Sequence, residues 1–525
     1  MTISHDRDGC DKSDLKLAVP QPEYLFKLRH NGRFVNRPYK LLFSIKFFGR
    51  GSGETLFFKK RFPRQENNTK MERIISGLTH LMPDGGHAEL RCQENLTRRV
   101  SMINGSLTAN SATNVSGVCS RVMRDGVWGH SSMAECSVEA ARTVLKAAAD
   151  NAAFMAGRVP KAGVYAAAVP TVQLMLPEVA LVRDYDRAGF LKALDAMILE
   201  LCPKLIGRTL SIFEERIERD LLVCDGTSGY TVMQRSYVYV FLTAEGKDGQ
   251  PLELFRAFDE PDRMADVREL ESGIVELYEM LMAKCEGVYA EAGVKTVIFD
   301  GALAGMLAHE AVGHTVEADL VLGGSVAAHN VGKQVASEMV SMVDFAHTID
   351  GKEAPLPVYL DDEGTAAQDC PIIVDGVLLE FMNSRESAAH FGMEARGNAR
   401  AFSFSDEPLI RMRNTVILPG KDKLEDMIAS VDDGYYFVQT GNGQADTTGE
   451  FMFGITMGYE IKKGKLGRAI LDTTISGVAF EMLKTVDMMS DTLKLESSGY
   501  CGKKQPMPVG LGGPDMRCKV MIGGR

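Results

Sequence analysis

The sequence predicts an α+β fold, with N-terminal and middle α/β units followed by a β-rich, barrel-like C-terminal domain. Three observations support this class. The chain has 525 residues, which is too many for a single hydrophobic core. Its hydrophobic and charged fractions, 45% and 25%, are ordinary for a globular protein. Helical and strand periodicities alternate up to residue 292, and strand and turn patterns dominate after it.

Residues 1–70 are expected to form a poorly ordered, basic extension. They hold 15 Lys and Arg against 7 Asp and Glu. Neither a helical period nor strand alternation persists along them, which is typical of a loosely held terminus. Met71 is an alternative start for the working protein. We assign this extension no function.

The N-terminal α+β domain is expected at residues 71–160. Its segment 87–132 is rich in β-forming residues and is interrupted by the turn signals Asn104-Gly105 and Asp125-Gly126. The pattern predicts several short strands there. An Ala-rich helix is predicted to follow at 138–157, because its apolar residues recur at helical spacing.

The middle α+β domain is expected at residues 161–292. Helical periodicity predicts helices at 184–202 and at about 264–291, with strands between them. The apolar stretch 294–300 is predicted to be a short strand that opens the C-terminal domain, residues 293–525.

The charge of the chain is unevenly shared, which bears on the class of partner. Residues 71–525 carry 44 Lys and Arg against 63 Asp and Glu. An acidic body argues against a nucleic-acid-binding surface on the folded part. No apolar run is long enough for a membrane span, and no secretory signal is recognised at the N-terminus. Ten scattered cysteines without a C-x-x-C pair indicate reduced thiols and a cytoplasmic protein.

The stretch 302-ALAGMLAHEAVGHTVEADL-320 is the main candidate site. His309 and Glu310 begin like the His-Glu-x-x-His motif of zinc peptidases, but the second histidine, His314, comes one residue late. Residues five apart in an α-helix point about 140° away from each other. A local π-helical turn would bring both imidazoles to one side, and Gly313 permits it at little steric cost. The C-terminal domain is then predicted to carry a metal-binding helix.

A catalytic zinc needs a third protein ligand and a neighbouring base. Glu310 is the natural base. The third ligand is open from spacing alone: an acidic residue, a histidine or Cys501, whose neighbours Lys503 and Lys504 favour a thiolate. The candidate histidines are His329, His347 and His390. Alternatively, His309 and His314 are core or capping residues that flank a glutamate by chance.

Two further motifs were weighed and set aside. Asp361, Asp362 and Glu363 could bind a cation, but acidic residues at a strand end are more often a solvated turn, which is our expectation here. The glycine-rich tail 498–514 lacks the lysine spacing of a P-loop and the strand-to-helix context of a dinucleotide-binding motif.

Several motifs lie along residues 75–518: Leu303-Ala304-Gly305, His309-Glu310-Ala311-Val312-Gly313-His314, Asp361-Asp362-Glu363-Gly364-Thr365, 397-GNAR-400, 411-RMRNT-415, Gly499-Tyr500-Cys501-Gly502-Lys503 and Pro508-Val509-Gly510. Together they resemble the TldD/PmbA family of metallopeptidases. The resemblance is strongest in the His-Glu-x-x-x-His element and in the late Gly-Tyr-Cys-Gly-Lys, which are specific to the zinc-bearing TldD branch.

This resemblance implies one zinc per active subunit, held by His309, His314 and Cys501, with Glu310 as general base. It also implies a two-subunit assembly, with a TldE/PmbA-like partner or a second copy, that admits unfolded peptides. The predicted function is therefore a cytoplasmic zinc metallopeptidase that hydrolyses peptide bonds through metal-activated water. The alternatives are a non-catalytic, metal-stabilised peptide-binding or scaffold subunit and, less favoured, a nucleic-acid-associated regulator.

Overall fold

The computed structural model describes residues 29–30, 33–34, 74–75, 77–83, 86–159, 161, 171–175, 185–260 and 263–523. The chain divides into two compact units, Met1–Asn67 and Asn68–Arg525. In the first unit the described residues are two short antiparallel strands, β1 (Arg29–His30) and β2 (Arg33–Phe34). The rest of the extension expected at 1–70, and the alternative start at Met71, lie outside the described residues.

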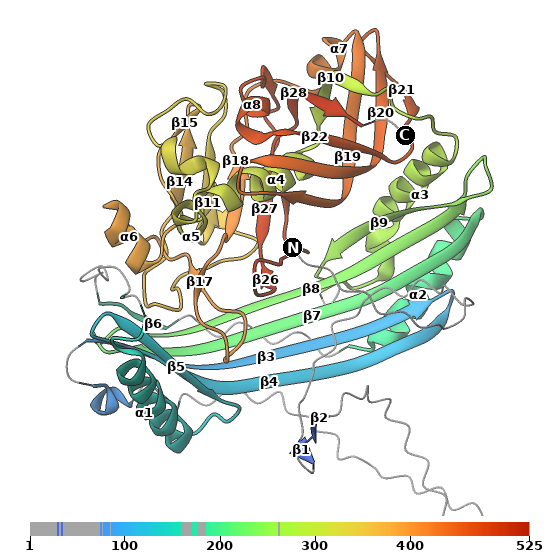
Figure 1. Ribbon diagram of the computed structural model, residues 1–525. Coiled ribbons are helices and arrows are strands. Elements are labelled where there is room, and N and C mark those ends of the chain that lie inside the picture. The colour runs from blue at the N-terminus through green and yellow to red at the C-terminus, as the bar shows by residue number, and fades with distance from the viewer. Residues whose placement is uncertain are drawn as a thin grey trace, which may run out of the picture. The chain divides into compact units, whose positions relative to one another are not determined.

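A long seven-stranded sheet dominates the N-terminal half of the second unit (Figure 1). Its order is β5-β4-β3-β7-β8, and both β6 and β9 pair with β8, at different places along it. The strands are β3 (His87–Ile103), β4 (Ser106–Arg124), β5 (Val127–Met133), β6 (Gln173–Met175), β7 (Leu205–Val223), β8 (Ser228–Glu245) and β9 (Pro251–Asp259).

Two-residue turns set the register of this sheet. Asn104 and Gly105 join β3 to β4 with φ angles of 47° and 78°, and Asp125 and Gly126 join β4 to β5 with φ angles of 51° and 75°. Positive φ at both positions matches the twist of antiparallel strands, so both predicted turns are confirmed. The expected short strands are instead strands of 17 and 19 residues, because the polar stretch 108–116 continues β4 on an exposed face.

Three helices pack on this sheet: α1 (Val138–Met155), α2 (Arg187–Leu201) and α3 (Glu271–Cys285). The predicted helices at 138–157 and 184–202 are confirmed within a few residues. The helix expected at 264–291 is shorter, because it begins with a 3-10 turn, η2 (Val267–Leu270), capped by Asp266. Strands from both expected N-terminal domains pair in this one sheet, and the boundary between those domains stays a prediction.

The C-terminal region is rich in sheet, as expected, and contains a closed five-stranded barrel. Its strands pair in the order β10-β19-β20-β22-β28, and β28 pairs back to β10. The helix α8 and the strands β21 and β23 adjoin it. The bounds are β10 (Gly293–Phe299), β19 (Asp433–Ala445), β20 (Glu450–Lys462), β21 (Lys465–Ala469), β22 (Thr473–Val478), α8 (Ala479–Leu483), β23 (Met488–Met489) and β28 (Met516–Ile522).

A six-stranded sheet, β15-β14-β11-β18-β27-β24, lies beside the barrel (Figure 1), and its strands alternate along the chain with those of the barrel. Its strands are β11 (Met342–Phe345), β14 (Cys370–Val374), β15 (Val377–Leu378), β18 (Asn414–Ile417), β24 (Lys494–Glu496) and β27 (Gly510–Gly513). The other short elements are η1 (Thr79–Leu81), α5 (Ala318–Leu322), η5 (Val326–His329), β12 (Thr348–Ile349), β13 (Lys352–Glu353), α6 (Arg385–Phe391), β16 (Ala399–Arg400), β17 (Leu409–Ile410), α7 (Leu424–Ala429), β25 (Tyr500–Cys501) and β26 (Met507–Pro508).

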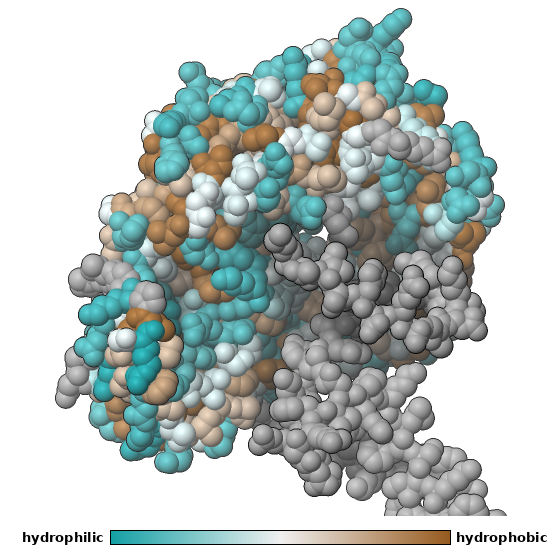
Figure 2. Space-filling model, in the orientation of Figure 1, coloured by the Kyte–Doolittle hydropathy of each residue, from teal (hydrophilic) through white to brown (hydrophobic). Residues whose placement is uncertain are grey.

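The largest hydrophobic core joins the barrel to the six-stranded sheet and includes the helix α4 (Gly301–Leu307). Hydrophilic residues cover much of the surface seen in Figure 2, with hydrophobic patches between them. Within the described ranges, no helix has the length and apolar character needed to cross a bilayer.

Candidate metal centre

The candidate site begins on an irregular helix that follows β10. Asp300 caps α4, and the helix continues as a π-helical turn, η3 (Ala308–Gly313), and a 3-10 turn, η4 (His314–Val316). The backbone N–H of His314 donates to the carbonyl of His309, five residues earlier. The predicted π-helical turn is thus present, and it places the two imidazole rings 5.1 Å apart between centroids.

Glycines allow this helix to lie close to its neighbours. A Cβ on Gly313 would lie 2.2 Å from the sulfur of Met412, and one on Gly305 would lie 2.6 Å from the backbone of Gly512. The glycines of the tail therefore let the backbone of β27 approach the backbone of α4 closely. This packing explains why the tail is rich in glycine, so a phosphate-binding role is not needed to explain it.

Three donor groups converge at this turn: His309, His314 and Cys501. Their ligand atoms all lie within 4.8 Å of one another, and Cys501 Sγ is 3.3 Å from His314 Nε2. His309 and Cys501 are buried, and His314 is partly buried. Cys501 arrives on β25, 187 residues after His314, so the contact depends on the packing of the C-terminal sheets.

Glu310 lies beside the donors without belonging to them. Its carboxylate oxygens are 3.7 Å from His314 Nε2 and 4.0 Å from His309 Nε2. A quarter of its side chain is exposed, against 2% for His309. Glu310 is thus a partly exposed carboxylate next to buried donors.

Glu317 orients the His314 ring. His314 Nδ1 donates to its carboxylate at 2.7 Å, and Lys503 Nζ approaches the same oxygen at 3.2 Å. Burial alone would lower the pKa of His314, but hydrogen bonds with Cys501 and Glu317 outweigh it and raise the pKa to about 10. The bond to Glu317 fixes the orientation of the ring, so Nε2 faces Cys501.

The Cys501 thiol is held as a thiolate. Burial would raise its pKa, but hydrogen bonds from His309 and His314 outweigh that effect and lower the pKa to about 3. Lys503 was expected to favour the thiolate, but its ammonium group binds Asp319 at 2.8 Å and the Ile410 carbonyl at 2.9 Å instead.

A buried arginine fixes the segment that carries Cys501. Arg411 is fully buried and donates to the carbonyls of Cys501, Lys503 and Gln505 at 2.8, 2.9 and 2.8 Å. Three carbonyls on one guanidinium leave the turn little freedom. Arg411 thus explains part of the motif 411-RMRNT-415.

The long sheet holds the residues just before Cys501. Arg235, Tyr237 and Tyr239 alternate along β8, so they share one face. Arg235 Nη1 donates to the Ser497 carbonyl at 2.8 Å, Tyr237 to the same carbonyl at 2.9 Å, and Tyr239 to the Ser498 carbonyl at 2.8 Å. Both halves of the unit therefore position the third donor.

The donor set fits a zinc ion. Zinc bonds of about 2.0–2.3 Å in tetrahedral geometry place ligand atoms roughly 3.3–3.8 Å apart, which the observed spacing can accommodate. Two imidazoles and one thiolate are zinc ligands, and the side chains of His314 and Glu310 are 19% and 25% exposed. His309 Nδ1 is buried without a hydrogen-bond partner. In the described part of the chain, no other three His, Cys, Asp or Glu residues approach one another so closely, which leaves His329, His347 and His390 outside this group.

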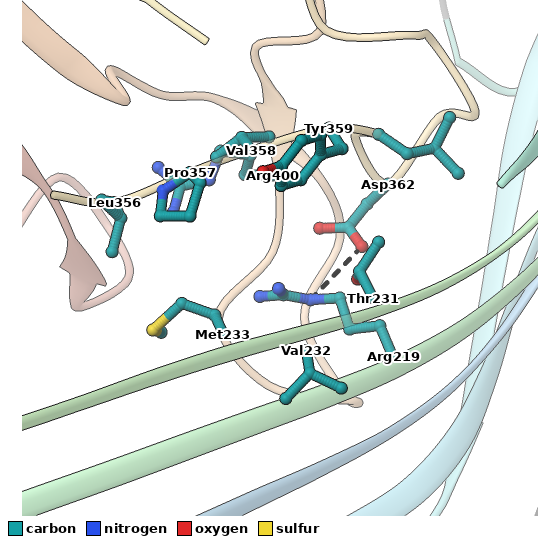
Figure 3. Close-up of a pocket in the computed structure, with 11 residues that line it drawn as sticks. Arg219, Thr231, Val232, Met233, Leu356, Pro357, Val358, Tyr359, Asp362 and Arg400 are labelled. Carbon is teal, nitrogen blue, oxygen red and sulfur yellow. Dashed lines mark ion pairs between the residues drawn. The ribbon is translucent and has the colours of Figure 1, made fainter. Parts of the chain in front are cut away.

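The expectation of a solvated turn at Asp361, Asp362 and Glu363 is wrong. Their exposed fractions are 3%, 5% and 2%. Glu363 binds Arg121 at 2.8 Å, and Asp362 lies 3.5 Å from Arg219 (Figure 3). Guanidinium groups of the long sheet compensate Asp362 and Glu363, and Asp361 accepts the backbone N–H groups of Glu363, Thr365 and Ala399. Sequence spacing gives no sign of such distant partners.

Comparisons with known proteins identify the family of this chain. Residues 292–524 match the family model of the PmbA/TldA metallopeptidase C-terminal domain, and residues 88–156 match that of PmbA/TldA metallopeptidase domain 1. A metalloprotease of Archaeoglobus fulgidus is 31% identical over 65% of this chain and 77% of its own. The chain therefore belongs to the PmbA/TldD family of metallopeptidases.

Other relatives match over shorter segments. A metalloprotease TldD homolog of Buchnera aphidicola is 40% identical over 45% of this chain and 49% of its own, so the chain spans about half of that relative. A zinc metalloprotease TldD homolog of Saccharolobus solfataricus is 33% identical over 49% of this chain and 58% of its own. The crystal structure of TldE from Thermococcus kodakarensis shares the fold, with a TM-score of 0.66 and 18% identity. The match covers 85% of this chain and 98% of TldE.

Proposed function

We propose that this family member is a zinc-dependent peptidase of the TldD branch that cleaves extended or unfolded peptides. The observation that carries the proposal is the convergence of His309, His314 and Cys501 at the π-helical turn, with Glu310 beside them. The name of the Saccharolobus solfataricus relative supports zinc as the metal. One ion per active subunit would bind here.

The chain's own residues would divide the work as follows. A bound Zn²⁺ supplies a Lewis acid that acidifies water and polarises a carbonyl. Glu310 accepts the proton of the attacking water and delivers it to the leaving amine. Glu317 keeps His314 in one tautomer, and Arg411 keeps Cys501 in place.

A groove beside the donors offers a place for the peptide. It encloses about 1020 Å³ and is lined by residues of α4, including Met306, and by Gly499, two positions before Cys501. The lining also includes residues of β9 and β24, and among the described strands each of these pairs with one neighbour. An extended peptide can add its backbone hydrogen bonds to such an edge with little sequence preference.

The assembly and the compartment complete the proposal. The shared fold with TldE supports a two-subunit enzyme, formed with a TldE/PmbA-like chain or with a second copy. All nine described cysteines are free thiols, which suits the reducing cytoplasm.

The first experiment measures bound metal in wild type and Cys501→Ala, together with cleavage of an unstructured peptide library with a TldE-like partner added. We expect stoichiometric zinc that is lost with Cys501, and metal-dependent cleavage. Metal that is unchanged in Cys501→Ala would refute the donor set. Metal binding with peptide binding but without cleavage would favour the non-catalytic scaffold.

Replacing Glu310 with Gln separates chemistry from metal binding. The variant keeps the donor set, so we expect wild-type zinc content and a loss of cleavage of at least about 100-fold, the usual contribution of a general base. Cleavage at the wild-type rate would show that another group takes the proton.

A further inference from the structure

A second group of reactive side chains lies outside the candidate metal centre, at the end of β7. Cys224 follows β7 directly and is partly exposed. Because β3 pairs antiparallel with β7, with Glu89 opposite Val223, the start of β3 lies beside it. Cys224 Sγ is 4.0 Å from His87 Nδ1 and accepts the backbone N–H of Ala88 at 3.3 Å.

The histidine is oriented by a buried carboxylate. His87 Nε2 donates to Glu89 at 2.8 Å. Glu89 is 3% exposed and accepts two hydrogen bonds from Arg121, at 3.0 and 2.9 Å. With Nε2 committed to Glu89, the Nδ1 atom faces the sulfur, so thiol, imidazole and carboxylate form an ordered series.

The charges in this series favour a thiolate. Burial would lower the pKa of His87, but hydrogen bonds with Cys224 and Glu89 outweigh it and raise the pKa to about 9. An imidazolium ring and a backbone N–H both stabilise a negative sulfur. The three groups do not surround one point, since Cys224 and Glu89 contact opposite nitrogens of the ring, so a shared metal ion is not indicated.

We propose that Cys224, His87 and Glu89 form a reactive thiol site that reduces small hydroperoxides and is itself converted to a sulfenic acid. The Cys224 thiolate attacks one peroxide oxygen, an S–O bond forms, and the O–O bond breaks. The sulfur is oxidised and the peroxide is reduced. The departing oxygen takes the proton of the His87 imidazolium, which yields water from hydrogen peroxide and a neutral sulfenic acid.

The test uses the zinc-loaded full chain. Wild type is treated with stoichiometric hydrogen peroxide in the presence of dimedone, which traps sulfenic acids, and the labelled cysteine is mapped by peptide mass spectrometry. We expect Cys224 to carry the label. Cys136 is a stringent internal reference, because it is also partly exposed and hydrogen bonds from the Cys92 thiol and the backbone, without an imidazole, lower its pKa.

Alkylation by iodoacetamide at pH 6 measures the thiolate directly. A free thiol is only about 0.3% ionised at this pH, so an ion-paired thiolate should react about tenfold faster even after its lower intrinsic nucleophilicity is counted. His87→Gln should remove this advantage, and the exposed His390→Gln should not. Thermal unfolding of each variant checks that it is folded.

Two results would overturn the proposal. One is labelling of Cys224 no faster than that of Cys136 in the folded wild type. The other is an unchanged Cys224 rate in folded His87→Gln. If His87→Gln does not fold, Glu89→Gln gives the same comparison, because it removes the carboxylate charge that favours the imidazolium.

Discussion

At the scale of single residues, the candidate centre depends on side chains that contact the donors and are not donors themselves. Glu317 is buried and fixes the ring of His314 through a 2.7 Å hydrogen bond. Such carboxylate partners raise the basicity of a ligating imidazole and hold its tautomer.

Glu317→Gln is therefore expected to weaken zinc binding by about 10- to 100-fold, the usual effect of losing such a partner. Competition with a chelator of known affinity measures it. The exposed Glu338→Gln is the matched control. Equal zinc affinity in Glu317→Gln and wild type would mean that Glu317 is a stability residue only.

The stability of the protein at low pH tests the role of Glu89. Arg121 and His87 overcome the effect of burial and lower the pKa of Glu89 from its ordinary value of 4.5 to about 2. A carboxyl with a lowered pKa stabilises the folded state above its unfolded pKa, and this contribution is lost as pH falls through the folded pKa.

We thus expect the free energy of unfolding to fall between about pH 5 and pH 2 partly through Glu89. In denaturant titrations, the difference in the free energy of unfolding between wild type and Glu89→Gln should become smaller over the same pH interval. A difference that is constant with pH would show that protonation of Glu89 is not linked to folding.

At the scale of elements, the π-helical turn η3 brings residues five apart to one side. Gly313 is packed against the Met412 sulfur, where a Cβ would lie at 2.2 Å. Gly313→Ala should lower the free energy of unfolding by about 1–3 kcal/mol through overpacking and should reduce zinc content. The double variant Gly313→Ala with Met412→Ala should recover part of the free energy of unfolding and part of the zinc content.

Denaturant titration and elemental analysis measure these effects. Gly77→Ala is the control, because no atom lies within 4 Å of its added Cβ. Full zinc content in Gly313→Ala would show that the turn tolerates a side chain.

The elements differ in how far the sequence could predict them. The π-helical turn followed from the odd spacing of His309 and His314 together with Gly313, which are local signals. Cys501 could not be selected from spacing, because sheet packing brings it to His314 from 187 residues away. Glu317 was missed, although its position three residues after His314 is the spacing of a helical side-chain pair. The burial of Asp361, Asp362 and Glu363 was missed because the arginine partners of Asp362 and Glu363 belong to the long sheet, far away in the sequence.

At the scale of the whole molecule, the groove beside the candidate centre gives a preference among peptides. Four carboxylates and two cations line it: Glu276, Glu279, Asp300, Glu496, Arg256 and Lys494. Arg256 pairs with Glu276 at 2.6 Å, and Lys494 pairs with Asp300. Within the described ranges Glu279 and Glu496 have no ion-pair partner, so they can face a ligand.

Peptides with Lys or Arg should therefore bind more tightly than matched peptides with Glu, by about threefold per charge and less at high salt. Fluorescence anisotropy with zinc-loaded Glu310→Gln measures binding without turnover. Glu279→Gln and Glu496→Gln should reduce the preference, and Glu338→Gln should keep it. A preference for acidic peptides would contradict this assignment of the groove.

The closure of the barrel has a consequence for how the molecule folds. The strands β10 and β28 pair through contacts such as Gly293 with Ile522, so the ring closes between distant parts of the sequence. Non-local pairing of this kind is slow, because the entropy of loop closure must be lost before the contacts form. The helix with His309 follows β10, and Cys501 precedes β28. The three donors should thus meet only in a late folding step, and zinc uptake during refolding should lag behind the formation of the long sheet.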